Sequence, residues 1–205
     1  MVDHTKHKYL IIVVYDFLIL LFNYYIIITK DVFMQNKSWV IKVFILTFFI
    51  CMLISGLSNF IATNSNLIIL FVITIIIILV GIIFDIIGTA VLTADEATFH
   101  AKASNKIKGS RESIKLIKNA SNIANFCNDI IGDICGIVSG SMGAMIAITI
   151  ANKFSLNATL VALIVSSVIS SIMVGGKAIG KNIAVRKGDK IIFKVGRLLH
   201  KFKWL

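Results

Sequence analysis

Seven side chains whose oxygen atoms could bind a metal ion lie within or beside strongly apolar stretches of the sequence. Carboxylate, hydroxyl and amide oxygens are the ligands that hard cations such as Mg²⁺ prefer, whereas softer metals prefer clustered Cys or His. The four histidines and three cysteines are scattered, without metal-ligand spacing. The sequence therefore indicates oxygen chemistry at membrane depth, at Asp85, Thr93, Asp95, Glu96, Asn128, Asp129 and Asp133.

Asp129 and Asp133 are four residues apart and therefore share one face of a predicted helix. Two ionised carboxylates at this spacing repel each other, so a bound cation would stabilise the pair. Two other arrangements remain open from the sequence. The carboxylates could pair with Lys177 or Lys181, or Asp129 could lie at the membrane interface.

The sequence lacks the common signatures of catalytic centres. It contains no H-E-x-x-H, G-x-S-x-G, P-loop or dinucleotide-binding glycine pattern. We therefore predict that the protein is not an enzyme, and that any energy source is supplied from outside this chain.

These polar residues lie in a sequence that is too apolar for a soluble globular domain. Of the 205 residues, 58% are hydrophobic and 15% are charged, against about 45–50% and about 25% in soluble domains. The composition predicts an all-α integral membrane protein. At about 20 residues for each span, the length suits one membrane domain and leaves no room for a nucleotide-binding domain of about 100 residues.

Five apolar runs follow one another along the sequence, each long enough to cross a bilayer. The first is interrupted by Asp16 and Asn23 and could lie at the interface instead, which would leave four spans. We expect residues 1–66 to form an N-terminal membrane hairpin and residues 67–205 to form the main membrane domain. The expected spans are 9–29, 39–62, 67–92, 130–151 and 156–175.

The basic residues predict the orientation of these spans. Most of the 21 lysines and arginines lie in residues 93–129 and from Lys177 onward, so these segments should face the cytoplasm and the N-terminus the outside. The net charge is +11, and the lysines and arginines that produce it flank apolar runs. This placement indicates contact with an anionic cytoplasmic leaflet rather than with nucleic acid. The many Ile and Lys residues are typical of AT-rich bacterial genes, which favours a bacterial plasma membrane.

Small residues predict where the membrane helices touch. Gly132, Gly136 and Gly140 recur every four residues, a spacing that lets two helix backbones approach closely in lipid. This stripe is the expected helix-packing face.

Two further helical segments are expected outside the spans. Residues 93–129 are polar and helical in composition, with a joint at Gly109–Ser110, and form a basic cytoplasmic elbow. Beyond Gly188, apolar and basic residues alternate as on two faces of a helix, which predicts an amphipathic juxtamembrane helix with Asp189 at its N-cap.

Three short motifs occur in a fixed order along residues 67–205. Thr93-Ala94-Asp95-Glu96 precedes the basic elbow, Gly132-Asp133 follows it, and a glycine-lysine pair opens the segment 176–184 after the last span. In this order they resemble the Ser-x-Ser-Glu, Gly-Asn and Gly-Glu-x-x-Pro-Lys-x-x-Ala motifs of the transmembrane domain of the CNNM/CorB/CorC family of magnesium transport proteins.

The resemblance implies a three-helix core, a juxtamembrane helix, a homodimer and a Mg²⁺ site. Lys177 departs from the family pattern because it replaces a carboxylate, and an ammonium group cannot bind Mg²⁺; it is a candidate counter-charge. The CBS and C-terminal domains common in the family are not expected here. The candidate metal-binding residues are the motif positions and the acids beside them: Thr93, Asp95, Glu96, Asp129 and Asp133.

Three functions remain open from the sequence. The first is transport or efflux of Mg²⁺ across the plasma membrane through a carboxylate-lined intramembrane site. The alternative is a non-transporting membrane scaffold or accessory subunit, in which a pair between Lys177 and a carboxylate replaces the ion site. A holin-like pore former with a basic tail is a third class, which the order of the motifs disfavours.

Overall fold

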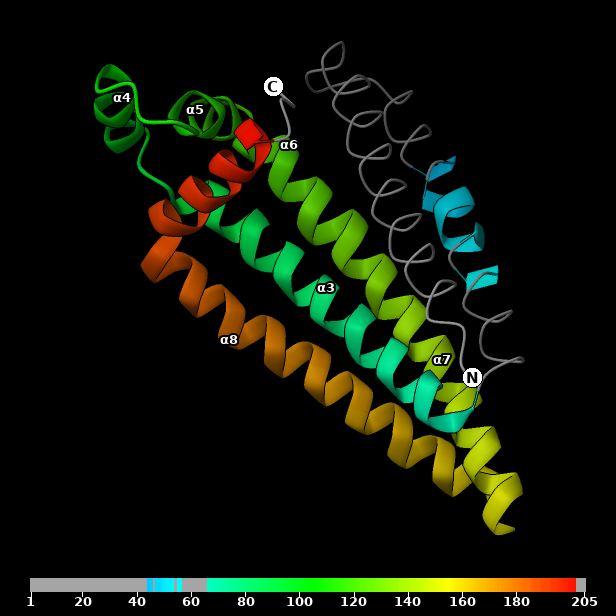
Figure 1. Cartoon of the computed structure of the whole chain (residues 1–205). Helices are drawn as coiled ribbons and strands as arrows, with labels where there is room; N and C mark the ends of the chain where they lie inside the picture. The colour runs from blue at the N-terminus through cyan, green and yellow to red at the C-terminus, as the bar shows by residue number, and fades with distance from the viewer. Residues whose placement is uncertain (1–43, 46, 54, 57–65, 202–205) are drawn as a thin grey trace, which may run out of the picture. The chain divides into compact units, whose positions relative to one another are not determined.

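The computed structural model describes residues 44–45, 47–53, 55–56 and 66–201 (Figure 1). No strand occurs within these ranges, which confirms the all-α prediction. The helices from residue 67 onward belong to one compact unit. They are α3 (Leu67–Thr93), α4 (Glu96–Ser104), α5 (Ser110–Lys118), α6 (Ala120–Asn125), the π-helix η1 (Phe126–Ile131), α7 (Gly132–Phe154) and α8 (Ala158–Lys201).

Three of the described helices are long and apolar enough to cross a membrane. They are α3, the continuous helix Ala120–Phe154 formed by α6, η1 and α7, and α8. At about 1.5 Å per residue, α3 measures about 40 Å, more than a hydrocarbon layer of about 30 Å.

These helices contain the predicted spans 67–92, 130–151 and most of 156–175. The predicted span 9–29 lies outside the described residues. Within 39–62 the described residues are helical. A count of five spans therefore remains a prediction.

One face of α3 is buried against the other two spans, whereas many of its large apolar side chains point outward. The buried residues recur at three- and four-residue spacing, as one helix face requires. Ile75, Ile76 and Leu79 are each more than half exposed, as expected for a helix surrounded by lipid. The buried stripe includes Leu70, Thr74, Ile78, Gly81, Asp85, Gly88 and Val91.

Helix α8 packs on α3 through a stripe of small residues that recurs every four positions. A Cβ atom added at Gly180 would lie 2.6 Å from Cγ1 of Ile86, and one added at Gly176 would overlap Cδ1 of Ile82. Ala184 and Gly188 continue the stripe and are fully buried. The missing side chains let Ile82 and Ile86 pack directly on the α8 backbone, and such van der Waals contact replaces the hydrophobic driving force in lipid.

The glycines of α7 differ in whether a neighbouring helix packs on them. A Cβ at Gly132 would lie 3.2 Å from Nζ of Lys177 on α8. Gly136 and Gly140 have no atom of the described residues within 4 Å of such a Cβ. Their predicted packing role remains a prediction, whereas the α8 stripe was not predicted.

Helix α8 kinks at Lys187, where the backbone has φ −128° and ψ 24°. The next residue, Gly188, packs on the end of α3, since an added Cβ would lie 2.8 Å from Oγ1 of Thr93 and 3.2 Å from the carbonyl oxygen of Ala90. After the kink, α8 turns across the end of α3 towards α5 (Figure 1). The helix break predicted at Gly188 is therefore found one residue earlier.

Within the predicted elbow, residues 93–129, α4 and α5 run transverse to the three spans (Figure 1). Residues 120–129 instead belong to the second span, so the elbow ends about ten residues earlier than predicted. Asp95 caps α4 by accepting the N–H of Ala97. Gly109 precedes α5 with φ +90°, a left-handed conformation that favours glycine. It also faces α8, because a Cβ there would lie 2.7 Å from Cα of Arg197. The joint predicted at Gly109–Ser110 is therefore confirmed.

The α3–α8 contact predicts unequal effects at two nearby glycines of one helix. Gly180→Leu should destabilise the chain in detergent by about 1–3 kcal/mol, because the side chain would collide with α3. Gly175→Leu should change stability by less than about 0.5 kcal/mol, because nothing described lies within 4 Å of a Cβ at Gly175. Thermal unfolding followed by circular dichroism measures both. Equal losses would contradict the packing of α8 described here.

Candidate functional site

Asp85 is the most deeply buried acid among the described residues, with 2% of its surface exposed. It lies on the α3 face that also carries Gly81 and Gly88. Because both glycines lack a side chain, the neighbouring helices approach α3 on either side of the carboxylate. A Cβ at Gly81 would lie 2.8 Å from Cβ of Cys135.

Four charged residues from the other two spans act on Asp85. Lys177 and Lys181 come from α8, Asp133 from α7 and Asp129 from η1. We name Asp85, Asp129, Asp133, Lys177 and Lys181 the charge cluster. It contains three acids and two bases, so its formal charge is negative.

Lys181 is the base closest to the buried acid. Its Nζ lies 4.0 Å from Oδ2 of Asp85, and its side chain is 55% exposed. This oxygen has no hydrogen-bond partner. An ionised carboxylate in a low-dielectric interior is costly unless it is paired and hydrogen-bonded. The lysine therefore compensates the charge of Asp85 only in part.

A second unpartnered oxygen, Oδ1 of Asn128, lies against the same face of α3. A Cβ at Gly88 would overlap this amide group, so only glycine accommodates it there. Gly88 is three residues from Asp85 and therefore on the same side of the helix. Oδ1 of Asn128 is buried and accepts no hydrogen bond. Two buried acceptor oxygens without a hydrogen-bond donor, one of Asp85 and one of Asn128, are therefore found at this face of α3.

Asn128 belongs to a π-helical turn, in which the N–H of Gly132 bonds to the carbonyl oxygen of Cys127. The extra residue of a π turn rotates the side chains of η1 relative to those of a continuous α-helix. Single π turns occur frequently at functional sites. Within this turn Asn128 lies against α3, whereas the next residue, Asp129, is exposed.

Lys177 lies over Gly132 and reaches Asp133. Its Nζ is 3.7 Å from Oδ1 of Asp133, and the lysine side chain is 21% exposed while the aspartate side chain is 69% exposed. The pairing of Asp133 with Lys177, which the sequence left open, is present in the structure. Asp133 remains accessible on its other side.

The remaining predicted ligands lie at the end of α3, where they contact neighbouring groups. Oγ1 of Thr93 donates to backbone carbonyls of α3 and, at 3.4 Å, to that of Ala184. Glu96 lies 3.0 Å from Nε2 of His100. Hydrogen bonds from the hydroxyl of Thr98 and the N–H of Ala97 hold the pKa of Asp95 below its usual range.

The predicted metal ligands therefore fall into two groups. Thr93, Asp95 and Glu96 lie at the end of α3, and Asp129 and Asp133 lie in the charge cluster. Within the part of the chain that the structure describes, no three His, Cys, Asp or Glu side chains are close enough to hold a metal ion together. The sequence singled out Asp85 and Asn128 as polar residues at membrane depth, but it did not pair Asp85 with Lys181.

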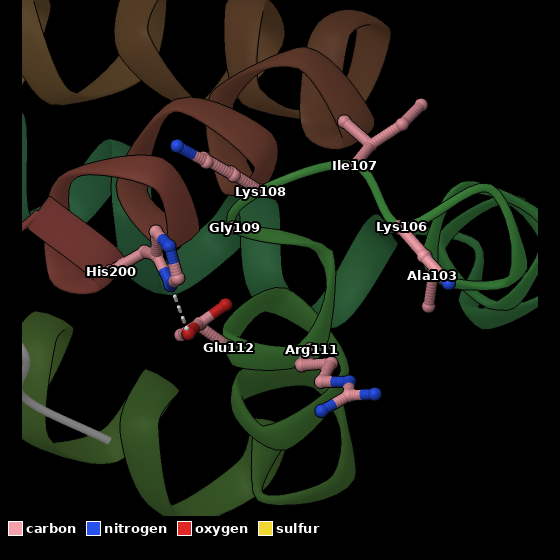
Figure 2. Close-up of a pocket in the computed structure, with 8 residues that line it drawn as sticks. All are labelled: Ala103, Lys106, Ile107, Lys108, Gly109, Arg111, Glu112 and His200. Carbon is pink, nitrogen blue, oxygen red and sulfur yellow. Dashed lines mark hydrogen bonds and ion pairs between the residues drawn. The ribbon is translucent and has the colours of Figure 1, made fainter.

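A separate polar contact joins the elbow to the end of α8. Nδ1 of His200 donates to Oε1 of Glu112 at 2.7 Å, and Figure 2 shows the two side chains turned towards each other. Burial alone would raise the pKa of Glu112, but the bond with His200, a bond from its own backbone N–H and the charges of His200 and Lys115 together lower it.

No family model matches the chain, and no curated protein or solved structure matches it. The described residues define its class by themselves: an all-α bundle with three helices that are long and apolar enough to cross a membrane.

The pairing of Asp85 with Lys181 predicts coupled mutational effects. Lys181→Gln should lower stability by about 1 kcal/mol, a modest loss because the lysine is half exposed. In an Asp85→Asn background the same substitution should change stability by less than about 0.5 kcal/mol, since no charge remains to be compensated. Chemical or thermal unfolding of the four proteins in detergent measures the coupling. Additive losses would contradict the pair.

The Glu112–His200 contact predicts a specific pH dependence. The pKa of Glu112 is lower in the folded state than its unfolded value of about 4.3. Ionised Glu112 therefore stabilises the fold above about pH 4.3, and this contribution is lost as the pH falls through the folded pKa. Glu112→Gln should melt at a lower temperature than the wild type at pH 7, and the difference should shrink near pH 3. A difference that stays constant would contradict this role.

Proposed function

We propose that the protein transports or exports a divalent cation, Mg²⁺, across the plasma membrane through the charge cluster. The observation that carries this proposal is the pair of buried oxygens without a hydrogen-bond partner, Oδ2 of Asp85 on α3 and Oδ1 of Asn128, which packs against Gly88 on the same face of α3. Carboxylate and amide oxygens are ligands of Mg²⁺, and an acid in a membrane-spanning helix is by default a functional residue.

The cluster offers a route from exposed to buried oxygens. Asp129 and Asp133 are exposed and would attract the hydrated cation first. Because Mg²⁺ dehydrates reluctantly, it would keep several waters and take only one or two carboxylates as ligands. Asp85 and Asn128 would then provide the inner oxygens. The spread of the acids over η1, α7 and α3 agrees with such a stepwise transfer.

Lys177 and Lys181 would act as internal counter-charges in this mechanism. Their ammonium groups lie close to Asp133 and Asp85. An arriving cation would displace an ammonium group from its carboxylate, and the returning ammonium group would favour release. No ATP-binding motif is present, so transport would be passive or coupled to another ion.

The resemblance to the CNNM/CorB/CorC family supports the same proposal, together with a homodimer. Thr93, Asp95 and Glu96 would then form the entrance to the route at the end of α3. The basic segments around this end would face the cytoplasm, as their lysines and arginines predict.

Flux measurements test the proposal. In proteoliposomes loaded with a Mg²⁺-sensitive dye, the wild type should produce Mg²⁺ flux, and Asp85→Asn combined with Asp133→Asn should reduce it at least about tenfold, because two of the three carboxylates lose their charge. Glu112→Gln, a carboxylate outside the cluster, is the control and should retain flux. Unchanged flux in the double variant would contradict the site.

A non-transporting scaffold or accessory subunit is the second candidate. It is favoured by the contacts of Lys177 with Asp133 at 3.7 Å and of Lys181 with Asp85 at 4.0 Å, which link α8 to the other two spans. Calorimetric titration with Mg²⁺ separates the two candidates. Binding by the wild type supports transport, whereas binding only after Lys177→Glu supports the scaffold.

A further inference from the structure

We propose that the protein binds the phosphate group of an anionic phospholipid at a site built by Lys102 of α4 and Arg197 of α8 around the ring of Phe193. This site is separate from the charge cluster, and it does not depend on the proposed transport. It lies where the elbow meets the last turns of α8 (Figure 1).

Cation–π contacts fix the two basic side chains in place. Nζ of Lys102 lies 4.8 Å from the ring centre of Phe99 and 4.9 Å from that of Phe193, so it bridges α4 and α8. Cζ of Arg197 lies 4.8 Å from the same ring of Phe193. Phe99 is fully buried, which anchors the arrangement. Such contacts orient a cation without neutralising it.

Neither cation has an acidic partner among the described residues: the ion pairs there involve neither Lys102 nor Arg197. Two positive groups that share one aromatic ring repel each other. An anion bound beside them would offset this positive charge and accept charge-assisted hydrogen bonds from the basic groups. The arrangement is therefore complementary to a phosphate group.

The adjoining surface adds further positive charge. A hollow of about 280 Å³ is lined by Ala103, Lys106, Ile107, Lys108, Gly109, Arg111, Glu112 and His200 (Figure 2). It borders the site, because Ala103 follows Lys102 and Gly109 packs against the backbone of Arg197. Its one acid, Glu112, already bonds to His200. The lysines and the arginine at its rim strengthen the attraction for an anion.

The surroundings favour a lipid over a soluble phosphate compound. Helices α4 and α5 lie transverse to the spans at their end, the orientation of segments that rest on a membrane surface (Figure 1). Exposed apolar side chains flank the basic residues, with Ile107 42% and Leu198 54% exposed. Basic residues at the membrane surface are attracted by anionic lipids, and the apolar side chains would contact the acyl chains.

Native mass spectrometry of the full chain in nonionic detergent tests the proposal. We expect one molecule of dioctanoyl-phosphatidylglycerol to bind more tightly than dioctanoyl-phosphatidylcholine, which has the same chains and no net charge. Lys102→Gln and Arg197→Gln should each weaken binding of the anionic lipid about fivefold. Lys102→Arg keeps the charge and the ring contacts and should retain binding.

Lys194→Gln is the matched control, because it removes a positive charge from the same helix at an exposed lysine that makes no described ring contact. It should change the affinity less than about twofold. Equal losses in Lys194→Gln and Arg197→Gln would show diffuse attraction and overturn the site. Binding of glycerol phosphate as tight as that of the anionic lipid would identify a soluble anion as the ligand and also overturn it.

Discussion

Helix α8 meets α3 through a stripe of small residues on which side chains of α3 pack directly, and the rest of the described structure depends on this contact. Gly176, Gly180, Ala184 and Gly188 face α3 at intervals of four residues. Bulkier residues would push the helices apart. Because Lys177 and Lys181 each follow a glycine of this stripe, the same rotation of α8 that buries the glycines brings one ammonium group to Asp133 and the other to Asp85. Packing and charge pairing are therefore set by one geometric constraint.

The charge cluster combines groups that an apolar bundle does not normally tolerate. Asp85 is buried with only a half-exposed lysine at 4.0 Å, and Asn128 adds an oxygen without a donor. Either a cation or the lysines can balance the acids, and this choice separates a transporter from a scaffold. The exposure of Asp133 matters for both candidates, since it leaves one carboxylate accessible from outside the bundle.

Helix α8 also connects two chemically different regions. Its first part carries the lysines of the charge cluster, and the part after the kink at Lys187 carries Phe193, Arg197 and His200. The kink is held by Gly188 on the end of α3 and by Asp189, which accepts the N–H of Asp95 at 2.9 Å. A lipid bound to the basic end would therefore hold the same helix that positions Lys177 and Lys181, which gives the membrane surface a mechanical connection to the cluster.

The sequence by itself determined the helical class, the apolar centres of the three described spans, the joint at Gly109–Ser110 and the helix break near Gly188, but not where the second and third membrane-crossing helices begin or end. These features follow from local properties, namely runs of apolar residues and the conformational freedom of glycine.

Only the tertiary structure decided which glycines touch a neighbour. Gly180 and Gly140 are equivalent in sequence pattern, but the rotation of each helix turns one onto α3 and leaves the other open. It also decided that Lys181 meets Asp85, that Thr93, Asp95 and Glu96 lie apart from Asp133, and that Asn128 packs against Gly88 of α3, because each depends on the register between helices that are distant in the chain.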